Sequence, residues 1–144
     1  MKQEHKKKLN SFFFFCYYFC LIANNIIGDD FISNKFYWLV GKFINDHYYS
    51  CENIFDKCST YLSYYFGNSN YDRVYLRKMY MFYNSFPIYT SILNKLSWNQ
   101  YLLLFDINDK IERYFYFKLS LFCKSNYYEL NKLINIDVYN LFNN

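Results

Sequence analysis

The apolar residues of this 144-residue chain recur every three or four positions over most of its length. Helices that bury one face have this spacing, whereas a half-buried strand alternates apolar and polar residues. No segment shows sustained alternation, and the three Gly residues form no hairpin-turn sequence. The pattern therefore predicts an all-α fold, organised as a single compact multi-helix bundle of about six to seven helices.

Polar and turn-forming residues predict where these helices begin and end. Asp, Asn and Ser side chains accept hydrogen bonds from the first turn of a helix, whereas Gly and Pro commonly follow the last turn. Helix starts are therefore expected at Asp72, at Ser97, at Asn108 or Asp109, and at Asn126, which has Glu129 at capping-box spacing. Helix ends are expected at Gly67, which a loop over Asn68–Tyr71 follows, and at Pro87.

The apolar stripes of these helices also predict the core. Four stripes are expected to be buried: Ile54, Cys58, Leu62 and Tyr65; Leu76, Met79, Tyr83 and Phe86; Ile111, Phe115, Leu119 and Phe122; and Leu130, Leu133, Ile134, Val138 and Leu141. Both tryptophans are expected to be buried as well. Trp38 lies near Gly41, whose missing side chain permits close helix packing, and Trp98 follows the Ser97 cap.

The composition is biased in a way that weakens single-residue arguments. The chain has 19 Tyr and 17 Phe, but one Ala and one Pro, and Lys outnumbers Arg by thirteen to three. The abundant residue types have AT-rich codons and the scarce ones have GC-rich codons, so mutational drift in an AT-rich genome accounts for the bias. Individual Tyr, Phe, Asn or Lys residues are therefore weak indicators of function.

The amino terminus raises the question of localisation. Four lysines, Lys2 and Lys6 to Lys8, precede an apolar run at Phe12–Ala23. This run is shorter than the roughly 20 residues that span a bilayer, and no small-residue cleavage site follows it. We expect an aromatic helix packed on the bundle of a cytoplasmic protein. The alternative is membrane association through the Phe12–Ala23 run.

The five cysteines indicate reduced thiols more than a disulfide framework, because their number is odd and no secreted scaffold is evident. Cys16 with Cys20, and His47 with Cys51, are each four residues apart and could offer two metal ligands on one helix face. No C-x-x-C sequence accompanies either pair. Incidental thiols are therefore expected, with no metal and no cofactor.

Six blocks of the chain carry motif residues in a fixed order: Tyr37–Ile44, Ser59–Gly67, Leu76–Pro87, Leu96–Tyr101, Asp109–Tyr116 and Glu129–Ile134. They resemble, in order and spacing, the amino-terminal helical domain of YhcG-type proteins of the PDDEXK nuclease superfamily. The third block follows the family pattern L-R-x-M-x-x-F-Y-x-x-F-P, and Gln100 stands where the family has His. The resemblance predicts a helical domain at residues 30–144 and a poorly matching segment at residues 1–29.

In that family the helical domain is followed by a PDDEXK nuclease domain, which holds metal with an Asp and with the Glu of an E-x-K motif. The one E-x-K sequence of this chain, Glu4 to Lys6, lies in the basic tail with no acidic residue before it. The resemblance therefore implies a recognition or assembly module without the nuclease half. We expect it not to be an enzyme.

A candidate nucleic-acid site lies in the helix that follows Asp72. Arg73 and Arg77 share one helix face, Lys78 flanks it, and Tyr71, Tyr75 and Tyr80 are interleaved with them. Guanidinium groups and aromatic rings suit phosphate contact and base stacking, which predicts DNA binding by a chain of net charge +4. Alternatively, these arginines lie on a solvated face and pair with carboxylates such as Asp72.

A different class of function also stays open. The chain can be a protein-interaction domain, or the remnant of a split or decaying PDDEXK nuclease gene. Its partners would then be a second copy of itself or a separate PDDEXK nuclease chain, and no small-molecule ligand is evident. Salt-dependent DNA binding that is lost on Arg77→Ala separates the two classes.

Overall fold

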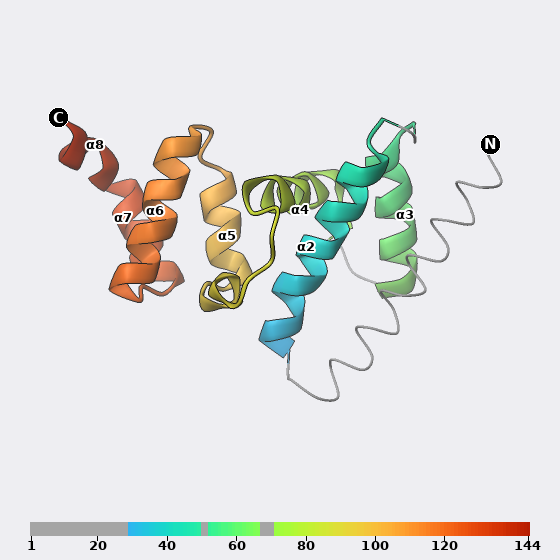
Figure 1. The fold of residues 1–144 in the computed structure, drawn as a ribbon, viewed down its shortest axis with the longest axis horizontal. Coiled ribbons are helices and arrows are strands. Elements are labelled where there is room, and N and C mark those ends of the chain that lie inside the picture. The colour runs from blue at the N-terminus through green and yellow to red at the C-terminus, as the bar shows by residue number, and fades with distance from the viewer. Residues whose placement is uncertain (1–28, 50–51, 67–70) are drawn as a thin grey trace. The chain divides into compact units, whose positions relative to one another are not determined.

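The structure is a computed structural model that describes residues 29–49, 52–66 and 71–144, without the side chains of residues 29–33, 65 and 66. These residues form no strand. They form seven α-helices and one 3-10 helix: α2 (Asp29–His47), α3 (Ile54–Phe66), α4 (Arg73–Ser85), η2 (Ser91–Lys95), α5 (Trp98–Phe105), α6 (Lys110–Cys123), α7 (Tyr127–Asn135) and α8 (Val138–Asn143) (Figure 1). The all-α prediction is confirmed.

The helices group into two compact units, divided between Tyr89 and Thr90. In the first unit α2 crosses α4, and α3 contacts both (Figure 1). In the second unit α5, α6 and α7 lie side by side, and α8 follows α7 at the carboxyl end (Figure 1).

The α2–α4 crossing is the most extensive helix contact in the first unit. A Cβ atom on Gly41 would lie 2.0 Å from the carbonyl oxygen of Met79, so only glycine permits this approach of the two backbones. Trp38, one turn earlier on α2, is 7% exposed, and its Nε1–H donates to the Phe86 carbonyl oxygen at 2.7 Å. The expected burial of Trp38 beside Gly41 is therefore confirmed.

The core of the first unit follows the predicted stripes closely. Ile54, Cys58 and Leu62 of α3 are buried, as are Leu76 and Met79 of α4. Two predicted positions of α4 differ: Tyr83 and Phe86 are half-buried, and Phe82 is buried instead. Tyr83 instead packs edge-on against the Trp38 ring, with 5.2 Å between the ring centroids. The Tyr65 side chain and Gly67 lie outside the described residues.

The second unit begins with a reciprocal capping box. Ser97 accepts from the Gln100 backbone N–H at 3.2 Å, and Gln100 Oε1 accepts from the Ser97 backbone N–H at 2.9 Å. Gln100 is 4% exposed, and its Nε2 also donates to the Ser125 carbonyl oxygen at 2.7 Å. One buried amide therefore joins the start of α5 to the loop between α6 and α7.

Several core predictions in the second unit are wrong. The predicted α6 stripe is not buried: Ile111 is 72% exposed and Phe122 is 87% exposed, whereas Phe115 and Leu119 are half-buried. The buried residues of α6 are Tyr116, Phe117 and Ser120, because α6 contacts α5, α7 and α8 through that face instead. Trp98 is half-buried, and its ring lies tilted against the Tyr101 and Phe105 rings of its own helix, with 6.4 Å between centroids in each case.

The last predicted helix is divided in two. Asp137 has a left-handed backbone conformation with φ of 57°, which interrupts the helix between α7 and α8. Leu130 and Val138 are buried as predicted, and Leu133 and Ile134 are half-buried. Leu141, in contrast, lies near the end of α8 and is 70% exposed, so its predicted burial is wrong.

Several predicted helix ends are confirmed. Asp72, Ser97, Asp109 and Asn126 each cap a helix through their side chains, and α4 ends at Ser85, just before Pro87. No helix in the described part of the chain is both long and apolar enough to cross a membrane. Phe12–Ala23 lies outside the described residues, so the expected aromatic helix there and the alternative of membrane association both stay predictions.

Candidate nucleic-acid interface

The predicted basic residues lie on the amino-terminal half of α4. Asp72 Oδ1 accepts from the Tyr75 backbone N–H at 3.0 Å and thereby fixes the start of the helix. Arg73 and Arg77 are exposed and share one face, as predicted, on the side away from the buried Met79. Lys78 is half-buried and flanks that face.

Arg73 makes a surface ion pair with α3. Its Nε lies 3.3 Å from Asp56 Oδ1, and the two side chains are 58% and 52% exposed. The carboxylate is not Asp72, which the alternative interpretation named, because Asp72 is used as the helix cap. An exposed pair of this kind contributes about 0–1 kcal/mol. Arg73 can therefore exchange Asp56 for a phosphate at small cost.

Arg77 lies over an aromatic ring. Its Cζ is 5.7 Å from the centroid of the Phe55 ring on α3, which is within the range of a cation–π contact. The Arg77 side chain makes no hydrogen bond or ion pair with any other described residue. The alternative interpretation expected these exposed arginines to pair with carboxylates, and Arg77 makes no such pair within the described residues.

The predicted tyrosines are not all available for stacking. Tyr71 is 6% exposed and packs edge-on against Phe36, with centroids 6.2 Å apart, so it belongs to the core. Tyr75 is half-buried. Tyr80 is half-buried as well and stacks on Tyr48, with ring centroids 5.7 Å apart and an interplanar angle of 15°. The stacking role predicted for Tyr71 is therefore corrected.

Sequence reasoning missed the rings that do lie near Arg77. Tyr48, Tyr49, Phe55 and Tyr80, the aromatic corner, form a contiguous group around the turn from α2 to α3. Tyr49 is 98% exposed and Tyr48 is 43% exposed. The one signal in the sequence was a pair of tyrosines among polar residues, which the abundance of Tyr in this chain made uninformative.

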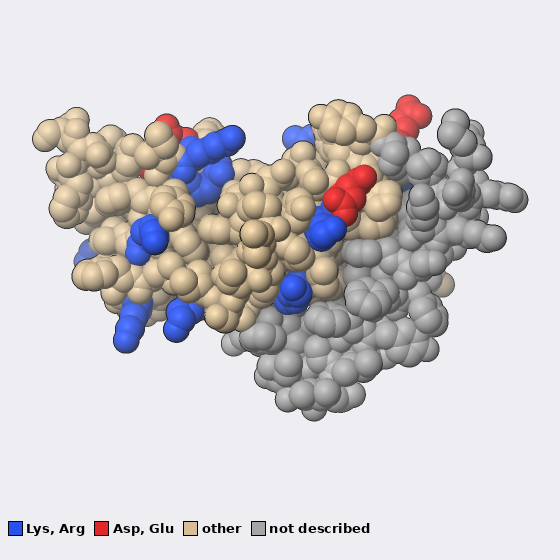
Figure 2. Space-filling model, in the orientation of Figure 1, with Lys and Arg blue, Asp and Glu red and all other residues tan. Residues whose placement is uncertain are grey.

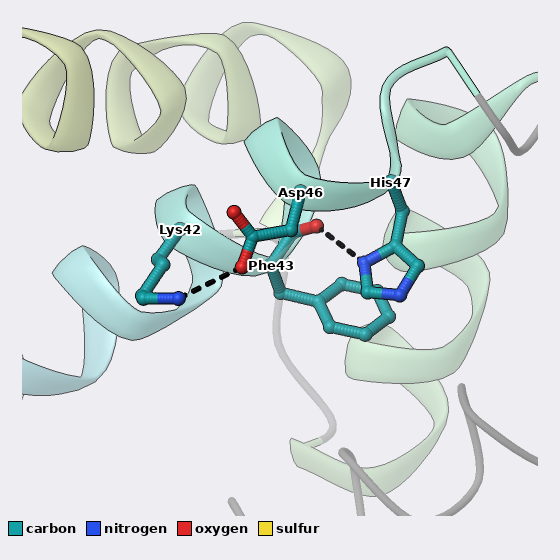
Figure 3. Close-up of polar contacts among 4 residues, drawn as sticks. All are labelled: Lys42, Phe43, Asp46 and His47. Carbon is teal, nitrogen blue, oxygen red and sulfur yellow. Dashed lines mark hydrogen bonds and ion pairs between the residues drawn. The ribbon is translucent and has the colours of Figure 1, made fainter.

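His47 anchors the end of α2 just before the aromatic corner (Figure 3). Its Nδ1–H donates to the Phe43 carbonyl oxygen at 2.9 Å, and its ring stacks on the Phe43 ring with centroids 4.2 Å apart. Lys42 and Asp46 form an exposed ion pair at 2.8 Å on the same helix, and this hydrogen bond raises the pKa of Lys42 (Figure 3). The last turn of α2 is therefore held by its own side chains.

Of the two proposed metal pairs, the structure describes only His47. Cys16, Cys20 and Cys51 lie outside the described residues, and His47 uses Nδ1 for the Phe43 hydrogen bond. The described residues contain no group of three or more His, Cys, Asp or Glu side chains placed to hold a metal ion.

Other basic residues are engaged within the protein. Lys35 Nζ lies 4.8 Å and 4.4 Å from the ring centroids of Trp38 and Tyr89, and burial lowers its pKa while raising that of Tyr89 to about 12. Arg113 donates twice to the Ile107 carbonyl oxygen, at 3.1 and 2.8 Å. On the face shown in Figure 2, Lys and Arg side chains are scattered among uncharged ones. Arg77 is thus the described arginine least committed to the fold.

The family model of the DUF1016 N-terminal domain matches residues 30–141. This match covers the six sequence blocks that resemble the YhcG-type amino-terminal domain. No curated protein and no solved structure matches the chain. The match extends over most of the sequence and over all the described helices but the ends of α2 and α8. The chain therefore belongs to the DUF1016 N-terminal domain family.

Proposed function

We propose that this chain is a helical module that binds nucleic acid through the amino-terminal half of α4. The observation that carries the proposal is Arg77, an exposed guanidinium with no ion-pair partner among the described residues, held over Phe55. Its donors are available to a phosphate, and the neighbouring ring restricts its motion. Arg73 and Lys78 flank it on the same helix.

The charge at this surface sets the expected strength of binding. Arg73 forms an ion pair with Asp56, and the chain as a whole carries a net charge of +4. Three phosphate contacts at most are expected from Arg73, Arg77 and Lys78. Each contact contributes about 0.9 to the slope of log affinity against log salt for a duplex, and about 0.7 for a single strand. Binding should therefore be modest and visible at low salt.

The test is a titration of fluorescently labelled DNA with the full chain at several salt concentrations. Arg77→Ala should weaken binding and reduce the salt slope by about 0.7 to 0.9, because one phosphate contact is lost. Lys132→Ala, which removes an exposed cation from α7, is the matched control and should leave both quantities unchanged. The melting temperature of Arg77→Ala should stay near that of the unmodified chain. No binding by the unmodified chain at low salt contradicts the proposal.

The proposed role is recognition without catalysis. The resemblance to YhcG-type proteins supports it, because in that family the PDDEXK nuclease chemistry lies in a separate domain. A nuclease domain is therefore the partner to test first. Incubation of the purified chain with DNA or RNA and Mg²⁺ or Mn²⁺ should give no cleavage. Cleavage that copurifies with the chain through successive columns overturns this part of the proposal.

A specific observation also favours the alternative of a protein-interaction domain. In the second unit, Ile111, Tyr114 and Phe122 of α6 are exposed at helical spacing. A groove of about 520 Å³ lies between α5 and α7, lined by Asn99, Leu102, Leu103, Asp106, Tyr127 and Tyr128. Light scattering during size-exclusion chromatography tests the simplest form of this alternative, because a second copy covering these side chains would give a dimer mass.

A further inference from the structure

The aromatic corner joins the proposed phosphate contact to a nearly bare ring. Arg77 lies over Phe55, and Phe55 packs edge-on against both Tyr80 and Tyr48, with centroids 6.0 and 6.4 Å away. Tyr48 in turn makes an edge contact of 5.1 Å with Tyr49. These side chains therefore form one continuous surface that begins at a cation and ends at an aromatic ring.

Tyr49 is placed for contact with a ligand more than for packing. It is 98% exposed, the most exposed of the described large hydrophobic side chains. Its neighbour Tyr48 is held by stacking on Tyr80, and the preceding His47 is fixed to Phe43 (Figure 3). The exposed Tyr49 ring, next to these fixed side chains, offers a flat surface that a planar group can cover without displacing core side chains.

We infer that the nucleic acid bound here is single-stranded, and that one of its bases stacks on Tyr49 while Arg77 contacts the backbone. In a duplex the base faces are already stacked on each other, and only the base edges are reachable from the grooves. An unpaired base presents its face to aromatic side chains, and arginine beside such rings is typical of single-strand binding. The small positive charge of this surface also favours a single strand, because duplex binding depends more heavily on phosphate contacts.

This inference rests on the proposed function and names the kind of ligand for the same site. The test measures fluorescence anisotropy of three labelled oligonucleotides of one mixed sequence, namely single-stranded DNA, the DNA duplex and single-stranded RNA. Both single strands, or one of them, should bind more tightly than the duplex. Tyr49→Ala should weaken single-strand binding by about 5-fold to 150-fold, the loss that corresponds to one stacked base. Tyr49→Phe should retain most of the affinity, because the ring is kept.

Tyr128→Ala is the matched control. Tyr128 is 80% exposed and makes an edge contact of 5.4 Å with the preceding Tyr127, much like Tyr49 with Tyr48, but it lies in the second unit. Its replacement should leave binding unchanged. Equal losses for Tyr49→Ala and Tyr128→Ala overturn the inference, and so does a duplex that binds as tightly as the single strands with no effect of Tyr49→Ala. The last result leaves the proposed function standing, whereas no binding of any oligonucleotide ends both.

Discussion

In the first unit the apolar residues of α2 and α4 face each other, whereas in the second unit α6 keeps much of its apolar surface exposed. Val40, Phe43 and Ile44 of α2 are at most 5% exposed, and so are Leu76 and Met79 of α4. On α6, Ile111, Tyr114 and Phe122 are all more than half exposed. The two regions are equally helical, so helix formation alone does not decide which apolar residues become core.

The difference comes from what each helix has to pack against. The α2–α4 crossing lacks a side chain at Gly41, so the two backbones approach closely and the surrounding side chains fill the contact on both sides. For α6, a narrower face with Tyr116, Phe117 and Ser120 meets the neighbouring helices of its unit. The sharpest tests of this contrast are substitutions that compare tightly packed positions with exposed ones.

The two tryptophans should give the largest difference. Trp38→Ala should lower the free energy of unfolding by about 3–5 kcal/mol, because it opens a cavity at the α2–α4 crossing and removes a hydrogen bond to Phe86. Trp98→Ala should cost only about 1–2 kcal/mol, since Trp98 is half-buried and its removal takes away less buried apolar surface than the removal of Trp38. Urea unfolding followed by circular dichroism measures both values. Equal losses in the two variants contradict the assigned difference in packing.

Gly41→Ala tests the crossing itself. Intrinsic helix propensity favours Ala over Gly by about 1 kcal/mol, so an isolated helix would gain stability. Here the added methyl group would collide with the Met79 carbonyl oxygen, and the backbone there cannot rotate away as a side chain can. We expect a loss of about 3 kcal/mol or more, at the upper end of overpacking effects. The sign of the change in melting temperature is the test. A higher melting temperature for Gly41→Ala would mean that α2 and α4 are not in close contact at this position.

Gln100→Leu tests the polar link in the second unit. Leucine retains the volume but removes the acceptor for the Ser97 backbone N–H and the donor to the Ser125 carbonyl oxygen. Leaving such buried groups unsatisfied should cost about 1–3 kcal/mol. The exposed Asn99→Leu is the matched control and should have little effect on the urea midpoint. Similar urea midpoints for both variants would show that the hydrogen bonds of Gln100 make no net contribution to the free energy of unfolding.

The sequence predicted the helix caps well. The caps at Asp72, Ser97, Asp109 and Asn126 depend on one side chain and the next few backbone groups, so their positions could be found from residue type and spacing. The orientation of α6 could not be found in this way. Ile111 and Phe122 share a helix face whether or not a neighbouring helix covers it, and the neighbours are set by long-range packing.

The candidate site shows the same difference between local features, which the sequence predicts, and long-range contacts, which it does not. The exposure of Arg73 and Arg77 followed from the helix period, because both lie on the side of α4 away from the buried Met79. The ion pair with Asp56 and the contact with Phe55 join α4 to α3, so no local pattern could have predicted them. Tyr49 was hidden for a different reason: among 19 tyrosines, only the structure distinguishes an exposed one from a buried one.

The smallest effect is expected on the outward face of α6. Phe122 is 87% exposed, so Phe122→Ser should change the free energy of unfolding by less than about 0.5 kcal/mol. Phe117→Ala, five residues earlier on the same helix, removes a side chain that is 4% exposed and should cost about 3–5 kcal/mol. Unfolding should be measured at two protein concentrations at least tenfold apart. A loss of several kcal/mol for Phe122→Ser, together with a melting temperature that rises with concentration for the unmodified chain, would mean that a second copy covers this face. The protein-interaction alternative would then gain the support that an exposed apolar face alone does not provide.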